Sequence, residues 1–342
     1  MLFLRRAQAI PLLFGLLSIT AGAAPAKRAA PTRPETPADN THAYKGAIVM
    51  DAASGTVLFE DRADYVGPPA SVTKLMTFLL VHDRIARGDL TLATPVNVTA
   101  ESAKTGGSQV YLAEKEVFSV EEMLYALMIA SANDAASALA IHLAGSRAAF
   151  VEQMNARAQS LGMDHTTFRS PHGLPPSSRQ LEDSDVTSPR DLAKLSLHLL
   201  KATDVVQYTS VKQRTFRPGP KRIDMVNHNH LLGKVAGVDG LKTGFTRGAG
   251  FCLAATALRN GRRLIVVTMG SPDSKTRDIK IAELLERGFA KLPAAVPFQS
   301  PESAPIAPAP RNATPPAKLA PPVAPEPAPS EAVIKFSIPP KR

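Results

Sequence analysis

Cysteine, tryptophan and clustered charge are what this sequence has least of. The 342-residue chain has one cysteine, Cys252, and no tryptophan. One cysteine excludes an internal disulfide framework, and because Cys252 lies in an apolar run, we expect a buried small hydrophobe and not a nucleophile. The net charge of +10 comes from basic residues scattered singly, and only 5 % of the residues are aromatic. These features argue against nucleic-acid binding and favour a basic surface suited to an anionic cell envelope.

Metal-binding patterns are also missing. The chain has 8 histidines, but no Glu-x-x-His or Cys-x-x-Cys partner stands near His228-Asn229-His230. We interpret these two histidines as polar loop residues and His172, in a Pro-His-Gly turn, as structural. The sequence therefore predicts no metal and no cofactor.

Near the N-terminus, the apolar stretch is too short to span a bilayer. Residues 7–20 are uncharged and mostly apolar, whereas a membrane-spanning helix needs about 20 apolar residues. Arg5 and Arg6 precede this stretch and Ala21-Gly22-Ala23 follows it, which is the pattern of a secretory signal peptide. We predict a signal peptide over 1–23 and a place in the periplasm or cell envelope, with the export route left open.

Proline is concentrated at the C-terminal end. Of the 30 prolines, 15 lie between Pro293 and Pro340. Such Pro- and Ala-rich sequence does not build a packed core, so we expect a disordered tail over 293–342. A similar composition over 24–40 predicts a short disordered leader, and the folded domain is expected over 41–292.

The stretch most suggestive of chemistry is Pro68-Pro69-Ala70-Ser71-Val72-Thr73-Lys74, which an apolar run follows. We expect a helix that starts at Ser71 and places Ser71 and Lys74 on one face. A serine hydroxyl becomes a nucleophile when a nearby base removes its proton, and an amine with a lowered pKa can act as that base. Alone, a Ser-x-x-Lys match is weak evidence, because it also occurs on ordinary capped helices.

Two later stretches strengthen the interpretation. Ser131-Ala132-Asn133-Asp134 interrupts an apolar helical region, so these polar residues are expected on a cleft and not in dry core. Lys242-Thr243-Gly244 lies in a strand-like segment. Ser-x-x-Lys, Ser-x-Asn and Lys-Thr-Gly in this order form the motif set of penicillin-binding proteins and serine β-lactamases.

Over residues 40–292 the chain most closely resembles the D-alanyl-D-alanine carboxypeptidases among the penicillin-binding proteins. The resemblance implies that Ser71 is acylated, that Lys74 is its general base, and that the backbone N–H groups of Ser71 and Phe245 hold the oxyanion. It also implies that Lys242 meets the terminal carboxylate of the substrate. The implied site is catalytic Ser71, Lys74, Ser131 and Asn133, with substrate-binding Lys242, Thr243, Gly244 and Phe245.

The function implied is removal of the terminal D-alanine from peptidoglycan pentapeptide stems, with β-lactam antibiotics as covalent inhibitors. An endopeptidase that cuts cross-links would use the same motifs. A β-lactamase is disfavoured, because the loop 170–185 lacks a Glu-x-x-Leu-Asn segment to activate water. A non-catalytic envelope protein that binds a partner through its Pro-rich tail is the alternative from another class.

The expected fold is α+β: a mainly antiparallel sheet packed with helices, plus a helical lobe, as in β-lactamases and transpeptidases. Hydrophobic patterns predict a hairpin over 47–60, strands over 94–99, 213–217, 237–242, 251–258 and 263–270, and helices over 71–88, 120–130, 135–144, 148–161, 189–201 and 275–292. The second β-rich domain and the terminal amphipathic helix of better-known family members are not visible, which leaves membrane attachment open.

Overall fold

The computed structural model describes residues 43–178, 180–217 and 219–292. The predicted signal peptide, leader and Pro-rich tail (1–23, 24–40 and 293–342) lie outside the described residues. Among the helices that the structure describes, none combines the length and the apolar character needed to cross a membrane.

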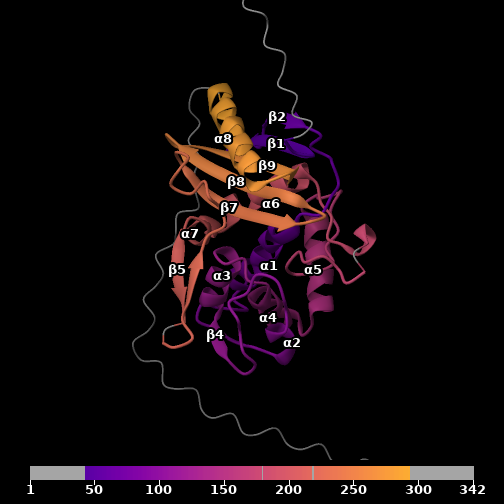
Figure 1. Cartoon of the computed structure of the whole chain (residues 1–342), viewed down its shortest axis with the longest axis vertical. Coiled ribbons are helices and arrows are strands. Elements are labelled where there is room, and N and C mark those ends of the chain that lie inside the picture. The colour runs from indigo at the N-terminus through magenta and orange to yellow at the C-terminus, as the bar shows by residue number, and fades with distance from the viewer. Residues whose placement is uncertain (1–42, 179, 218, 293–342) are drawn as a thin grey trace, which may run out of the picture.

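A five-stranded antiparallel sheet, in the order β2-β1-β9-β8-β7, forms one half of the molecule (Figure 1). β1 near the N-terminal end pairs with β9 near the C-terminal end, with Ala47 opposite Thr268. The predicted antiparallel sheet is thus confirmed, and β7 is an edge strand. The strands are β1 (Gly46–Asp51), β2 (Val57–Asp61), β7 (Val238–Thr246), β8 (Gly250–Arg259) and β9 (Arg262–Ser271).

Helices cover both faces of this sheet. Ile265 and Val267 of β9 pack into the core shared with the helical lobe, whereas Leu264 and Val266 pack against α8 (Ser274–Lys291). Because side chains alternate between the faces of a strand, a strand covered on both faces has a continuous apolar sequence. Figure 1 shows α8 on one side of the sheet and the helical lobe on the other.

The helical lobe follows the sequence patterns closely. Ser119 and Ser188 cap α3 and α6, accepting hydrogen bonds from the N–H groups of Glu122 and Asp191. The short elements α2, β4, η3, α7 and β6 were not predicted. The remaining elements are η2 (Ala70–Thr73), α1 (Lys74–Ala86), β3 (Pro95–Asn97), α2 (Ala100–Ala103), β4 (Val117–Ser119), α3 (Val120–Met128), α4 (Asn133–Ala144), α5 (Arg147–Ser160), η3 (Leu181–Asp183), α6 (Pro189–Ala202), α7 (Val205–Thr209), β5 (Gln213–Phe216) and β6 (Ile223–Val226).

Some predicted boundaries were wrong. Ser71 does not cap an α-helix; it lies in the 3-10 turn η2, in which the Val72 N–H bonds the Pro69 carbonyl at 3.3 Å, and α1 begins at Lys74. The strand predicted to end at Lys242 continues as β7 to Thr246, because pairing with β8 overrides the weak strand propensity of glycine.

Candidate active site

The predicted nucleophile and its predicted base are in direct contact. Lys74 Nζ lies 3.0 Å from Ser71 Oγ. The same Nζ donates to Asn133 Oδ1 at 2.6 Å and to the His172 carbonyl oxygen at 2.7 Å. Two acceptor oxygens from separate segments therefore hold the amine against the serine hydroxyl.

Burial lowers the pKa of Lys74 well below its usual value. The side chain is fully buried, at 0 % exposed, and loss of hydration disfavours the charged ammonium. The positive charge of Lys242 lowers this pKa further, whereas the charges of Asp185 and Asp134 raise it. The environment thus favours the neutral amine that a base requires.

Ser131 and Asn133 lie where the chain enters α4. Ser131 is 2 % exposed, has a φ of 57°, and its Oγ has no hydrogen-bond partner among the described residues. Asn133 is anchored by hydrogen bonds to the carbonyls of Gly106 and Ser108, both at 2.8 Å. A buried polar atom without a partner and a strained backbone are features that gather at functional sites.

Lys242 projects from β7 and is 2 % exposed. Its Nζ donates to the Thr243 carbonyl at 3.0 Å. Burial and then the charge of Arg277 lower the pKa of Lys242 to about 7. Arg277, in the first turn of α8, bonds Asp278 Oδ1 at 2.7 Å. The charge of Arg277 acting on Lys242 makes this a place where an anion is favoured.

Two glycines let separate backbones approach Ser71 closely. A Cβ atom on Gly244 would lie 2.4 Å from the Pro69 carbonyl oxygen and 3.1 Å from the Ser71 nitrogen. A Cβ atom on Gly173, where φ is +84°, would lie 1.9 Å from the Ala70 carbonyl oxygen. Side chains at these positions would push β7 and the 170–185 loop away from Ser71.

A hollow of about 370 Å³ brings most of the predicted residues together. Lys74, Asn133 and Lys242 do not line the hollow but lie behind its lining. Lys74 Nζ contacts Ser71, Asn133 contacts Lys74, and Lys242 Nζ contacts the Thr243 carbonyl. Its lining includes His228, His230 and Arg277, which the sequence analysis did not assign to the site. No local motif marks Arg277, because only the packing of α8 brings it here. The lining comprises Ser71, Ser108, Ser131, His228, His230, Thr243, Gly244, Phe245, Phe251, Ser274 and Arg277.

Both pocket histidines and His172 have distinct surroundings. Burial and then the charge of Lys242 lower the pKa of His228 to about 4, and burial and then the charge of Lys74 lower that of His172 to about 3. His230 Nδ1 lies 3.7 Å from Asp278 Oδ2. His228 and His172 are therefore neutral at pH 7, and His172 contributes its carbonyl to Lys74.

Asp185 fixes the loop that carries this carbonyl. Its Oδ1 accepts from the N–H groups of Arg169 and Ser170 at 2.5 and 2.9 Å. Its Oδ2 accepts from Thr73 Oγ1 at 3.0 Å and from Ser170 Oγ at 2.9 Å. A buried carboxylate with four donors ties the loop to η2, and the loop holds Lys74 in turn.

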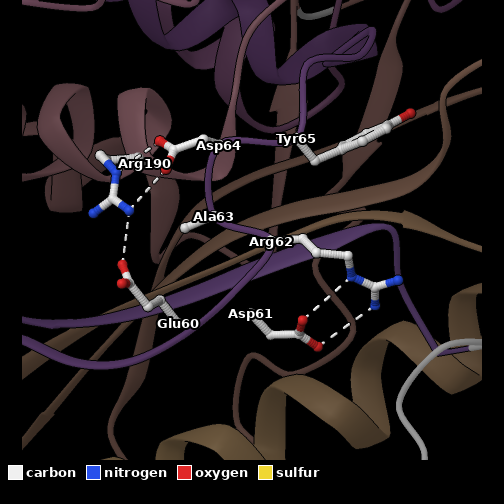
Figure 2. Close-up of a pocket in the computed structure, with 7 residues that line it drawn as sticks. All are labelled: Glu60, Asp61, Arg62, Ala63, Asp64, Tyr65 and Arg190. Atoms are coloured by element: carbon white, nitrogen blue, oxygen red, sulfur yellow. Dashed lines mark hydrogen bonds and ion pairs between the residues drawn. The ribbon is translucent and has the colours of Figure 1, made fainter.

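A larger hollow, of about 660 Å³, lies among charged residues elsewhere in the chain (Figure 2). Arg190 bonds Asp64 and Glu60, both at 2.7 Å, and Arg62 lies 3.2 Å from Asp61. Figure 2 shows these side chains directed toward one another. Because each of these charges has a partner within the chain, this hollow is a weaker candidate for chemistry.

Comparison with known proteins gives the family that the sequence motifs indicated. A family model described as D-alanyl-D-alanine carboxypeptidase matches residues 31–273. The D-alanyl-D-alanine carboxypeptidase DacF of Bacillus subtilis is 34 % identical over 251 residues, which are 73 % of this chain and 63 % of that protein. The D-alanyl-D-alanine endopeptidase of Escherichia coli is 32 % identical over 226 residues, 65 % of this chain and 70 % of that protein.

Solved structures give the same result. Penicillin-binding protein D2 of Listeria monocytogenes in its ampicillin-bound form superposes with a TM-score of 0.64 at 34 % identity, covering 72 % of this chain and 97 % of that chain. The chain belongs to the D-alanyl-D-alanine carboxypeptidase family. It spans less than two thirds of the length of the Bacillus relative.

Proposed function

We propose that this chain is a serine D-alanyl-D-alanine carboxypeptidase that removes the terminal D-alanine from peptidoglycan pentapeptide stems. The observation that carries the proposal is the contact of 3.0 Å between Lys74 Nζ and Ser71 Oγ, made by an amine whose pKa is lowered by burial and by Lys242. A serine beside a neutral amine is an activated nucleophile.

The hydrogen bonds of Lys74 define how the serine is activated. A neutral amine has two N–H donors and one lone pair. The Asn133 and His172 oxygens accept the two donors, so the lone pair is left for the Ser71 hydroxyl. Lys74 takes the Ser71 proton as Oγ attacks the carbonyl of the penultimate D-alanine, and the N–H groups of Ser71 and Phe245 receive the oxyanion.

Substrate recognition and departure of the product use the rest of the hollow. Lys242 and Arg277 attract the terminal carboxylate, beside Thr243. The unpartnered Ser131 Oγ relays the proton that Lys74 took from Ser71 to the amine of the leaving D-alanine as the peptide bond breaks, so Lys74 becomes neutral again. Water then attacks the ester on Ser71, which releases the tetrapeptide and restores the hydroxyl.

An endopeptidase that cuts cross-links is the nearest second candidate, supported by the similarity to a relative of that name. The same residues would serve it, because the residue leaving from a cross-link also carries a carboxylate. Comparing D-alanine release from a pentapeptide with cleavage of a cross-linked dimer separates the two activities.

A β-lactamase is less well supported. Glu182 is the one glutamate of the 170–185 loop, and it lines a different hollow, with Thr167 and Arg169. It is therefore not placed to activate water at Ser71. A non-catalytic envelope protein is disfavoured by the intact Ser71–Lys74 contact.

Incubation with a fluorescent penicillin, followed by a D-alanine release assay, tests the proposal. We expect a stable adduct on Ser71, release of D-alanine from a pentapeptide, and loss of both in Ser71→Ala, with the thermal unfolding curve retained as the control for folding. Rapid turnover of the penicillin would indicate a β-lactamase, and no labelling would indicate a binding protein. Export to the cell envelope is part of the proposal and is tested by fractionation.

A further inference from the structure

A second hollow, of about 600 Å³, lies beside the proposed active site. Ala70, the neighbour of Ser71 in η2, forms part of its lining, and so does Gly173, which packs against Ala70. Thr246 and Arg247, where β7 ends, form another part. None of these four residues lines the hollow that holds Ser71.

The direction of β7 indicates which part of a substrate would reach this hollow, an argument that rests on the proposed function. β7 is the edge strand of the sheet among the described residues, and extended peptides bind such edges as an added strand. Lys242, which would attract the terminal carboxylate, precedes Phe245, whose N–H would receive the oxyanion, along β7. The preceding residues of the substrate therefore continue past Thr246 to Arg247.

The walls of the hollow combine apolar surface with one cation. Pro68, Leu174 and Pro175 contribute apolar surface. Arg247 is exposed, and within the part of the chain that the structure describes its guanidinium makes no hydrogen bond or ion pair. The acidic residue of the lining, Asp185, already accepts four hydrogen bonds from η2 and its own loop. The hollow thus suits an aliphatic chain that ends in an anion.

We infer that this hollow binds the side chain of the third stem residue, which precedes the two D-alanines, and that Arg247 selects a side chain ending in a carboxylate. The methylene groups of that side chain pack against Leu174 and Pro175. A third residue that ends in an amine alone leaves Arg247 without a partner and places two positive charges together. Arg247 is accordingly a specificity residue that does not take part in the bond-breaking steps.

Two pentapeptides that differ only at the third residue, meso-diaminopimelate or L-lysine, test the inference through the ratio of their kcat/KM values. We expect the unaltered protein to favour the diaminopimelate peptide up to about fivefold, mainly through KM, since a contact with an exposed charge has about this strength. Arg247→Gln should bring the ratio to about 1, and Arg247→Glu should reverse it. Arg287→Gln, which removes an exposed arginine of α8, is the matched control and should keep the original ratio.

A ratio near 1 in the unaltered protein, or a ratio that Arg247→Gln does not change, would overturn the inference. D-Alanine released equally from both peptides would leave the proposed function standing and remove only the role of Arg247. No release from either peptide would instead overturn the proposed function, and the inference with it. Penicillin labelling of Ser71 in each variant shows that the site is intact, so a change in ratio is not a consequence of misfolding.

Discussion

Two charged hollows in this molecule are built on opposite principles. Around Arg190, guanidinium and carboxylate groups on the surface pair with one another at 2.7 Å (Figure 2). Around Ser71, Lys74 and Lys242 are 0 and 2 % exposed, and their hydrogen bonds go to uncharged oxygens. The paired hollow is the larger of the two, yet the hollow with unpaired cations is the one that can do chemistry.

The difference lies in what each arrangement does to protonation. Pairing with Asp64 and Glu60 holds Arg190 in its charged form and lowers the pKa of the Asp64 carboxyl. Burial without a carboxylate partner pulls the pKa values of both lysines down instead. A group whose protonation changes near neutral pH can transfer a proton, whereas a permanently paired charge cannot.

The largest effect on activity is expected from replacing Lys74, the buried lysine beside Ser71. Lys74→Met should slow acylation of Ser71 by a fluorescent penicillin about 10³- to 10⁴-fold, because general-base catalysis is lost. Lys74→Arg should not restore the rate, since a guanidinium keeps its proton. Recovery of the rate in Lys74→Arg would show that charge, and not proton transfer, is what position 74 supplies.

The pH dependence of kcat/KM tests how the two lysines are coupled. Lys74 must be neutral and Lys242 charged, so we expect a bell-shaped profile whose alkaline limb lies near pH 7, the pKa of Lys242. In Lys242→Gln that limb should disappear. The acid limb should move to higher pH, because the charge that lowers the pKa of Lys74 is gone. An acid limb that stays in place would contradict the coupling.

Replacing Lys242 should lower the activity of the protein but raise its stability at pH 7. Its folded-state pKa of about 7 lies below the unfolded value of about 10.4, so the unfolded chain binds more protons between these pH values. The free energy of unfolding should therefore rise with pH from about 7 to 10. Lys242→Met should flatten this rise and stabilise the protein at pH 7 by about 1–2 kcal/mol, as measured by urea unfolding at several pH values.

The smallest effect is expected at the paired hollow. Arg190→Gln should lower the free energy of unfolding by at most about 1 kcal/mol, since exposed ion pairs contribute little, and D-alanine release should not change. High salt should reduce the stability difference further. A large loss of activity in this variant would mean that the two hollows are coupled through α6.

Short motifs in the sequence predicted eight site residues, of which Ser71, Ser131, Thr243, Gly244 and Phe245 line one hollow; the roles of all eight stay a prediction. Local patterns also predicted the longer strands and helices, because alternation and capping residues act over a few positions. The short elements α2, β4, η3, α7 and β6 carry too few residues for a pattern. Tertiary pairing determined both the extension of β7 to Thr246 and the 3-10 turn at Ser71.

What the sequence could not reveal is contact between distant segments. His172 meets Lys74 through a backbone carbonyl, which any residue type possesses. Arg277 reaches the hollow only because α8 packs on the sheet beside β9, and His228 only because its loop returns to β7. Arg247 likewise has no ion-pair partner among the described residues, because Asp185, the carboxylate of the same hollow, is already held by four donors from other segments, a property of the fold and not of a motif.

The glycines at 173 and 244 restrict which substitutions the protein can accept beside Ser71. A side chain at either position would collide with the backbone of residues 69–71 and displace Ser71, so such a variant should react more slowly with peptide and, on the proposed function, with a β-lactam as well. On the proposed function, a variant that escapes a β-lactam while still acting on peptide would therefore carry its substitutions farther from the serine.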